Sequence, residues 1–215
     1  MSRLGDNLEA IVITQIASAQ QSIDIAVTGI SLPGVAQALV ERQIFTNFSY
    51  AIDPPLNIGE VREIRVNESM SACNKKYQEE ATGTPSGIGY AVGVSKEVSR
   101  PGYVKFDGYD ATTKTLKDAK GFGYKVNNNG TWSNTKGGRK MSDKLLNQAI
   151  RQEQAAKAAG IQLIEWLVAE EKYLTAFQTV LTQAQTSRIR LRYTRPSEDT
   201  KRLCKKKAES ASSSH

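Results

Sequence analysis

One segment near the middle of the chain constrains its fold more than any other. Residues 103–106 are a short β-branched and aromatic run, residues 108–113 are turn-like, and residues 115–120 form a second strand-like run. This pattern predicts a β-hairpin. Asp107 closes the first strand of the hairpin, and Asp118 lies late in the second.

Two carboxylates and an amine are expected to share one face of this hairpin. Residues near the same end of adjacent antiparallel strands lie close together, so Asp107 and Asp118 can share one divalent cation. Lys120 follows Asp118 by two residues and therefore points to the same face. Such a group can hold Mg²⁺, orient water and stabilise the charge that develops on an attacked phosphate. The hairpin therefore predicts phosphodiester hydrolysis.

An acid followed two residues later by lysine also occurs by chance. The chain holds three such tripeptides, at 118–120, 170–172 and 199–201, so two of them must be background. The second opens an amphipathic helical stretch and the third lies in a polar tail, and neither has an acidic partner on a neighbouring strand. In the alternative interpretation, Asp107 belongs to a turn, and Asp118 and Lys120 are solvated charges on an edge strand.

The pattern around the hairpin predicts an α/β fold. Upstream, residues 71–81 suit a helix and residues 89–94 suit a strand. Downstream, the sequence predicts a helix from Ser142 or Asp143 to about residue 159 with Gly160 as its stop, a strand at 161–168, an amphipathic helix at 169–185 and a strand at 188–193. The expected order is helix, three-strand meander, helix, strand, helix, strand.

This order, with an Asp followed by Asp or Glu, any residue and Lys, resembles the core of the restriction-endonuclease-like superfamily. More narrowly, the chain resembles the restriction-endonuclease-fold toxins, which are C-terminal nuclease domains of bacterial polymorphic toxins and type VI secretion effectors. The residues that carry this resemblance are Tyr77-Gln78, Thr82-Gly83, Val104-Lys105-Phe106-Asp107-Gly108, Leu116, Asp118-Ala119-Lys120-Gly121 and Trp166. The similarity covers roughly residues 73–194.

The resemblance implies a role for each residue of the motif. It makes Asp107 and Asp118 the metal ligands, and it makes Lys120 the residue that positions water or stabilises the phosphate. Many members of the superfamily add an acid from the first helix, where Gln78, Glu79 and Glu80 lie side by side. Neighbouring helical residues differ in direction by about 100°, and the sequence does not choose among the three.

The charge of the chain is uneven. Residues 1–72 carry 4 Lys or Arg against 8 Asp or Glu, a net charge of −4, whereas residues 73–215 carry 25 against 14, a net charge of +11. The basic part contains the candidate site, which favours a polyanionic substrate. Four cations in a Gly- and Asn-rich loop can follow a phosphate backbone: Lys125, Lys136, Arg139 and Lys140. The alternating Arg188, Arg190 and Arg192 suit the wet face of an edge strand.

Cysteine and histidine usage excludes several kinds of site. Cys73 and Cys204 are far apart and form no Cys-x-x-Cys motif, and His215 is the only histidine. A zinc site, a His-based nuclease and a Ser-His-Asp triad are therefore not expected. Two separate cysteines also predict no disulfide framework. The metal must be held by oxygen, which points to Mg²⁺ or Mn²⁺.

Composition predicts three regions in the chain. Residues 1–70 are expected to form a helical N-terminal extension, residues 71–196 the nuclease domain, and residues 197–215 a disordered basic and Ser-rich tail. The charge-free stretch at 25–40 is too short for a membrane span and is broken by Gly and Pro. The pattern of a secretory signal peptide is not apparent, so export would need a specialised secretion machine or a larger carrier polypeptide.

These observations lead to one expected function and two alternatives. The expectation is a Mg²⁺-dependent deoxyribonuclease toxin that a specialised secretion system delivers to the cytoplasm of competing bacteria, with a delivery protein as a further partner. The resemblance implies an immunity protein that inhibits it in the producing cell, and this partner should be acidic because it must cover a basic cleft. The alternatives are an RNase on the same scaffold and a noncatalytic adaptor that binds nucleic acid.

Overall fold

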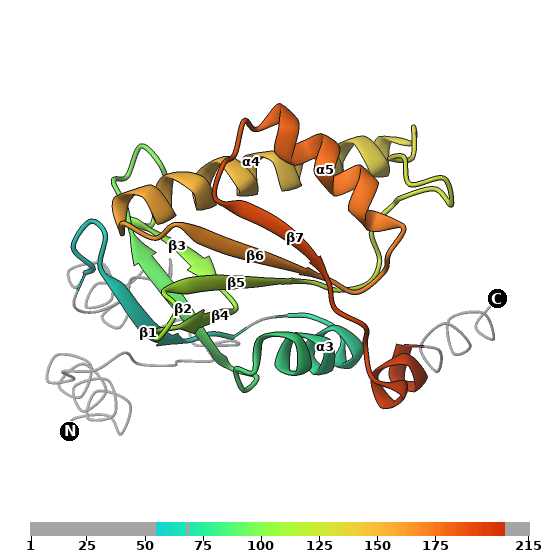
Figure 1. The fold of residues 1–215 in the computed structure, drawn as a ribbon, viewed down its shortest axis with the longest axis horizontal. Coiled ribbons are helices and arrows are strands. Elements are labelled where there is room, and N and C mark those ends of the chain that lie inside the picture. Colours follow the sequence, from blue (N-terminus) through green and yellow to red (C-terminus); the bar gives the residue numbers. More distant parts are fainter. Residues whose placement is uncertain (1–54, 68, 205–215) are drawn as a thin grey trace, which may run out of the picture. The chain divides into compact units, whose positions relative to one another are not determined.

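The strands and helices of the chain follow the expected order, with two strands that the sequence did not predict: Val61–Arg65 before the first helix and the short Gly108–Asp110 within the predicted hairpin. The computed structural model describes residues 55–67 and 69–204 (Figure 1). In chain order the elements are β1 (Val61–Arg65), α3 (Ala72–Thr82), β2 (Ile88–Gly93), β3 (Tyr103–Phe106), β4 (Gly108–Asp110), β5 (Thr115–Lys120), α4 (Lys136–Ala158), β6 (Leu163–Val168), α5 (Tyr173–Gln183) and β7 (Ile189–Tyr193).

The strands form two sheets. The first contains β1, β2 and β3 in that order, and its neighbouring strands are antiparallel. The second has the order β4-β5-β6-β7: β4 is antiparallel to β5, whereas β5, β6 and β7 are parallel. Parallel neighbours need a crossover connection, and α4 and α5 supply the two crossovers. This mixed α/β architecture confirms the expected restriction-endonuclease-like fold.

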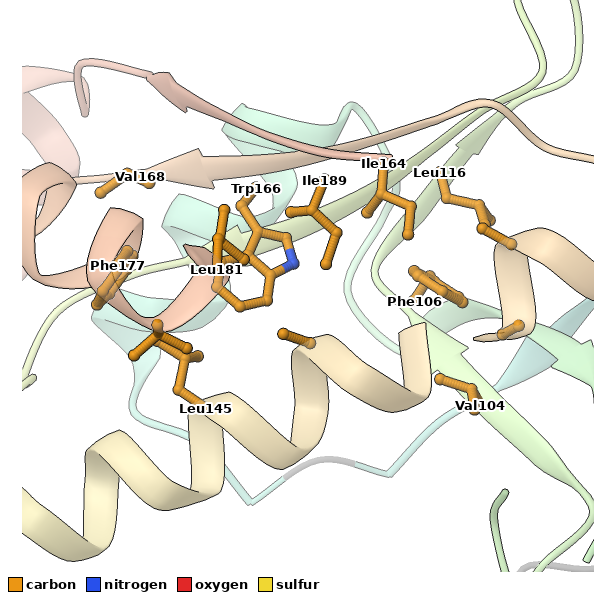
Figure 2. Close-up of a cluster of buried hydrophobic side chains, with 14 of the residues drawn as sticks. Val104, Phe106, Leu116, Leu145, Ile164, Trp166, Val168, Phe177, Leu181 and Ile189 are labelled. Atoms are coloured by element: carbon orange, nitrogen blue, oxygen red, sulfur yellow. The ribbon is translucent and has the colours of Figure 1, made fainter. Parts of the chain in front are cut away.

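Helices cover both faces of the second sheet. Helices α4 and α5 lie on one face and α3 lies on the other (Figure 1). Under α4 and α5, Trp166 of β6 packs with Leu145 and Phe177 in the main apolar core (Figure 2). Leu167, the next residue of β6, packs with Tyr77 in a smaller cluster on the opposite face. The alternation follows from the two-residue period of a strand, and it buries β6 on both faces.

Helix α4 begins earlier than its sequence predicts. The expected start was Ser142 or Asp143, but the helix starts at Lys136, and the Thr135 side chain accepts a hydrogen bond from the Gly138 N–H at 3.1 Å. Two glycines in the first turn conceal this start because glycine is a poor helix former. The expected stop is confirmed, since Gly160 follows the helix with a left-handed φ of 67°.

The segment expected to be the hairpin turn is partly a strand. Residues 108–113 were predicted as turn-like, yet Gly108–Asp110 form β4 and pair with β5. The turn itself is shorter. Asp110 Oδ1 accepts hydrogen bonds from the N–H groups of Thr112 and Thr113, and Lys114 has a left-handed φ of 50°. The antiparallel partner of β5 is therefore β4, while β3 pairs with β2.

The structure differs from the sequence-based expectations at both ends of the described residues. Strand β1 pairs with β2, so Val61–Arg65 is not part of a helical extension. The helices expected within residues 1–54 lie outside the described residues. Residues 198–204 are helical, which contradicts the disorder predicted from residue 197, and residues 205–215 again lie outside the described part.

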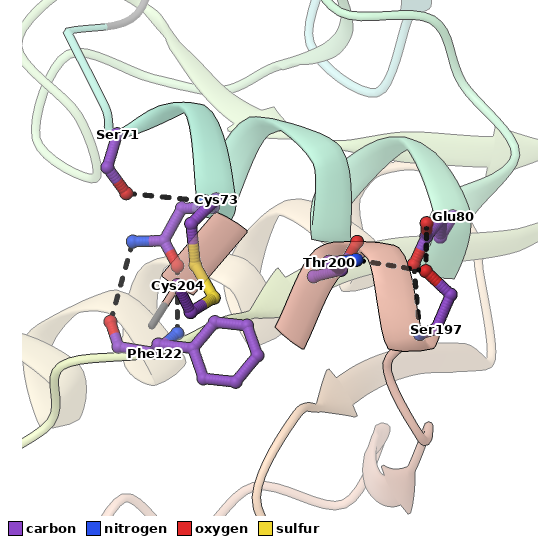
Figure 3. Close-up of a disulfide and its surroundings, with 8 residues drawn as sticks. Ser71, Cys73, Glu80, Phe122, Ser197, Thr200 and Cys204 are labelled. Carbon is purple, nitrogen blue, oxygen red and sulfur yellow. Dashed lines mark hydrogen bonds between the residues drawn. A yellow bond between two sulfur atoms is a disulfide. The ribbon is translucent and has the colours of Figure 1, made fainter. Parts of the chain in front are cut away.

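The short C-terminal helix at 198–204 is attached to α3 at two places. Cys204 forms a disulfide with Cys73 at the start of α3 (Figure 3). The Glu80 carboxylate, near the end of α3, accepts hydrogen bonds from Ser197 Oγ at 2.7 Å and from Ser197 N at 3.2 Å. The expectation that the two cysteines form no disulfide is therefore wrong, because the fold brings together residues separated by 131 positions.

Candidate active site

Asp107 lies where the chain passes from one sheet to the other. It is the single residue between β3 and β4. Its backbone N–H donates to Lys117 O at 3.0 Å, and its Oδ2 accepts a hydrogen bond from Ala119 N at 2.8 Å. The register pairs Gly108 with Lys117, and one further step sets Asp107 opposite Asp118. The structure thus places Asp107, directly before β4, next to Asp118 of the neighbouring strand β5.

Asp118 and Lys120 form a buried ion pair. Their side chains are 7% and 2% exposed, and Lys120 Nζ lies 2.5 Å from Asp118 Oδ1. They are not solvated charges, and β5 is not an edge strand because β4 and β6 flank it. Both statements contradict the alternative interpretation of this motif. A buried ion pair is stable only when further hydrogen bonds compensate for the lost water.

Two glutamines of α4 supply these further hydrogen bonds. Gln148 Nε2 donates to Asp118 Oδ2 at 2.9 Å, and Gln152 Nε2 donates to the same oxygen. Gln148 Oε1 accepts from Lys120 Nζ at 3.1 Å. Neither glutamine was predicted from the sequence. Their signal is a pair of amides four residues apart on the face of α4 that also carries the buried Leu145 and Ala149.

Trp166 of β6 completes this network. Its Nε1 donates to Gln152 Oε1 at 2.7 Å, and its ring lies under Lys120, with Nζ 4.4 Å from the ring centroid. Trp166 and Gln152 are fully buried. The Trp166 ring therefore contacts the ammonium through its face and the amide through its N–H. The sequence marked Trp166 only as part of the family resemblance.

Tyr124 lies close to both carboxylates. Burial raises the pKa of its hydroxyl, and the negative charges of Asp118 and Asp107 raise this pKa further. The phenol is therefore neutral at ordinary pH. Its ring packs edge-on against Phe177 with centroids 4.8 Å apart, and the Trp132 ring stacks on the same Phe177. These aromatic side chains pack against the main core.

The α3 residues that the sequence proposed for the site have different surroundings. Gln78 is buried. Glu79 Oε1 accepts a hydrogen bond from Ser86 N at 2.9 Å, and Glu80 is bound to Ser197 as described above. The carboxylate of Glu80 thus faces the C-terminal helix (Figure 3) and is not joined to the Asp118–Lys120 pair.

The cations that the sequence singled out fall into two groups. Lys125 is in the loop before α4, but Lys136, Arg139 and Lys140 lie in the first turns of α4 and not in the predicted loop. All four are exposed. Arg188 instead pairs with Glu153 at 2.7 Å, and Arg192 pairs with Glu165 at 3.4 Å. These two ion pairs agree with the expectation that the alternating arginines lie on the solvated face of an edge strand.

The other two tripeptides of acid, any residue and lysine lie at the surface. Lys172 pairs with Glu170 at 2.8 Å, and Lys201 pairs with Glu198 at 2.7 Å. Lys172 is 39% exposed, in contrast to the 2% of Lys120. Burial therefore distinguishes the motif at 118–120 from its chance copies.

The oxygen atoms at this site fit a hard divalent cation in kind. Asp107 and Asp118 offer carboxylates, and Gln148 offers an amide oxygen, which are the donor types that Mg²⁺ and Mn²⁺ prefer. Within residues 55–67 and 69–204, no group of three or more His, Cys, Asp or Glu side chains is placed to hold a metal. Asp118 already accepts three N–H groups, so a cation bound there must share or replace them.

Among the described residues 55–67 and 69–204, no helix is long and apolar enough to cross a bilayer.

Comparison with known proteins identifies the family of the segment that contains this site. Residues 74–171 match the family described as restriction endonuclease fold toxin 5. This segment includes the ion pair, both glutamines and Trp166. Comparison of the chain with curated proteins and with solved structures gave no match. The resemblance seen in the motifs is thus confirmed: the segment that contains the candidate site matches a family of restriction-endonuclease-fold toxins.

Proposed function

We propose that this chain hydrolyses DNA phosphodiester bonds with a divalent cation and acts as a toxin against competing bacteria. The observation that carries the proposal is the buried Asp118–Lys120 pair, which lies beside Asp107 within the segment that matches the toxin family. A buried charge pair is costly to keep. A site that must stabilise charge on a phosphate gives a reason for it, because such interactions are strongest where water is excluded.

Lys120 is the residue that we expect to meet the reacting phosphate. Asp118 and Gln148 accept hydrogen bonds from its ammonium group, which has three N–H donors. The remaining donor can bind a phosphoryl oxygen or orient water. Asp107 and Asp118 would hold Mg²⁺ or Mn²⁺, which supplies positive charge and a more acidic bound water when present. Asp107 is only partly buried, so we expect the substrate to approach from its side.

The exposed cations offer a surface for the substrate. Lys125 lies in the loop before α4, and Lys136, Arg139 and Lys140 lie in the first turns of this helix. Lysine and arginine that neutralise phosphates release counterions and so drive binding. This surface supports a nucleic-acid substrate over a small phosphoester. The carboxylates and Lys120 act on phosphate and not on sugar, so DNA and RNA must be separated by experiment.

The toxin role implies two protein partners. An immunity protein that covers this basic surface should be acidic, because complementary charge steers and orients association. A specialised secretion system with a delivery protein would carry the toxin to the cytoplasm of the target cell.

The decisive experiment measures cleavage of supercoiled plasmid and of total RNA, with Mg²⁺ or with EDTA. The variant is Lys120→Met, which keeps the volume of the side chain and removes its charge. The matched control is Lys172→Met, which alters the surface copy of the motif. We expect Mg²⁺-dependent plasmid cleavage that is lost in Lys120→Met and kept in Lys172→Met.

Other results would select the alternatives. Cleavage of RNA alone identifies an RNase. If neither nucleic acid is cut, or if Lys120→Met cuts normally, the adaptor interpretation replaces the nuclease. An adaptor should also bind DNA equally well or better when Asp107 and Asp118 are both changed to Asn, because negative charge is removed beside a basic surface.

A further inference from the structure

We propose that Gln148 and Gln152 are positioning residues that hold the Asp118 carboxylate and the Lys120 ammonium in their reactive arrangement. The inference rests on the proposed nuclease function. Its basis is the convergence of both amides on Asp118 Oδ2, which leaves Oδ1 to Lys120. Two donors on one oxygen and one on the other fix the rotation of the carboxylate about its side-chain bond.

Gln152 has only one orientation that satisfies its neighbours. The indole N–H of Trp166 is a donor and never an acceptor, so it requires the oxygen of the Gln152 amide. The amide nitrogen must then face Asp118. Gln152 and Trp166 are both fully buried, so water cannot replace either partner. Trp166 therefore acts on Asp118 through Gln152.

Gln148 acts differently, because it binds both members of the ion pair. Lys120 can only donate, so it requires the oxygen of Gln148, and the nitrogen of Gln148 then faces Asp118. Together with the bond from Lys120 to Asp118 Oδ1, this bridge fixes the direction of two of the three ammonium N–H groups. The third is then aimed by the geometry of the other two. Gln148 is partly exposed, so it lies nearer to the open side of the network than Gln152.

Core packing alone does not explain two glutamines at these positions. Burying an amide is unfavourable unless its hydrogen bonds are made, whereas Leu or Met fills similar space without that requirement. A well-packed apolar core would also not need Trp166 to orient an amide. The full set of bonds is explained if the carboxylate and ammonium must be held in one geometry.

The test compares Gln148→Met, Gln152→Met and Trp166→Phe with the exposed Gln154→Met on the same helix as control. Three quantities are measured: the single-turnover rate of plasmid cleavage in Mg²⁺, the plasmid affinity in EDTA and the melting temperature. We expect the rate to fall about 10- to 100-fold in the three variants, while plasmid affinity in EDTA stays at the wild-type value. Gln154→Met should cleave normally.

A spectroscopic measurement tests the same network without relying on activity. The chain has two tryptophans, so its ¹H–¹⁵N spectrum should show two indole signals, and Trp132→Phe assigns them. Trp132 Nε1 donates to Ala176 O, away from the glutamines. In Gln152→Met we expect the Trp166 indole proton to move upfield and the Trp132 signal to stay in place.

The outcomes separate this inference from the proposed function. If wild type cleaves and Gln148→Met cleaves at the same rate, the positioning role is wrong and the nuclease stands. Because Gln148 is partly exposed, this variant serves if the buried variants fail to fold. An unmoved Trp166 indole signal in a folded Gln152→Met also overturns the inference. If wild type cleaves no nucleic acid, the proposed function itself fails, and the positioning role fails with it.

Discussion

At the residue scale, the feature that most needs compensating interactions is the buried charge on Asp118 and Lys120. Both side chains are removed from water. Hydrogen bonds within the pair and from two amides of α4, together with the contact of Lys120 with the Trp166 ring, compensate for this. Loss of one partner therefore leaves an uncompensated buried charge. Loss of both charges together leaves only polar groups and some unfilled space.

A double-mutant comparison should show this coupling. We expect Lys120→Met alone to lower the free energy of unfolding by about 3–5 kcal/mol, because Asp118 then lacks its countercharge. The double variant Asp118→Asn, Lys120→Met should lose less stability than Lys120→Met alone. Urea unfolding followed by circular dichroism measures both values. Equal losses, or losses as small as that of the surface variant Lys172→Met, would contradict the buried-pair interpretation.

Sequence spacing was enough to predict that Asp107, Asp118 and Lys120 lie together, but it did not predict the other residues of the candidate site. Asp118 and Lys120 are two residues apart on one strand, so their common face follows from the period of a strand. Asp107 follows from its place at the end of the preceding strand. The glutamines come from another element, and nothing local shows which amides of a helix will face a carboxylate across the core. Glu80 was considered for the site because of its place in the sequence, but its hydrogen-bond partner is Ser197, which lies far away in the sequence and could not be predicted from local patterns.

At the element scale, the start of α4 depends on a close backbone approach that only glycine allows. A Cβ on Gly138 would lie 2.1 Å from Ser133 O, whereas a Cβ on Gly137 would have Thr135 Oγ1 as its nearest neighbour at 3.9 Å. The sequence shows two equivalent glycines, but the structure makes them different.

The two glycines should therefore respond oppositely to alanine. Gly137→Ala should stabilise the protein by about 0.4–1 kcal/mol, since alanine favours the helix and restricts the unfolded chain. Gly138→Ala should destabilise it by about 1–3 kcal/mol, because Ser133 backbone must move. Thermal unfolding of the two single variants, followed by circular dichroism, measures both effects. Effects of the same sign would show that the approach of Ser133 does not control this helix start.

The connection between α4 and the segment before β7 should depend on pH. Burial raises the pKa of Glu153, but hydrogen bonds from the backbone and side chain of Arg188 and from Ser187 outweigh burial, and the net pKa lies below its usual value. The ionised form is therefore favoured by folding. Its stabilisation is present above the unfolded pKa and is lost as the pH falls through the lower, folded pKa.

Glu153→Gln tests this linkage. At pH 7 the variant should melt at a lower temperature than wild type, because the charged contact to Arg188 is lost. The difference should shrink as the pH falls below about 4.5, the usual range for a glutamate. Melting curves between pH 7 and pH 2.5 measure the trend, with the exposed Glu171→Gln as control. A difference that stays constant with pH would assign the effect of Glu153→Gln to packing.

At the scale of the whole molecule, the order of the elements can be predicted from the sequence more fully than the contacts between distant parts of the chain. The helices and strands from 71 to 193 were placed in order because each has its own periodicity. Strand β1 was missed because it is short and only partly buried, and β4 because its three residues look like a turn. The C-terminal helix was missed because its composition is polar, and its attachment depends on Cys73 and Glu80 of a distant helix.

This attachment makes the stability of the protein sensitive to reduction. The Cys73–Cys204 disulfide joins the first helix of the nuclease fold to the last described residues, and the loop it closes contains the entire candidate site. Such a long closed loop restricts the unfolded chain strongly. We expect loss of the disulfide to lower the free energy of unfolding by about 2–4 kcal/mol. Urea unfolding of oxidised protein, with and without a phosphine reductant, measures the change.

The double variant Cys73→Ser, Cys204→Ser is the control for this measurement. It should match the reduced wild type in stability and should not respond to the reductant. If the reductant leaves wild-type stability unchanged, the C-terminal helix is held mainly by the contact of Glu80 with Ser197. Glu80→Gln should then destabilise the protein more than the cysteine changes do. In that case, delivery into a reducing cytoplasm would leave the fold intact.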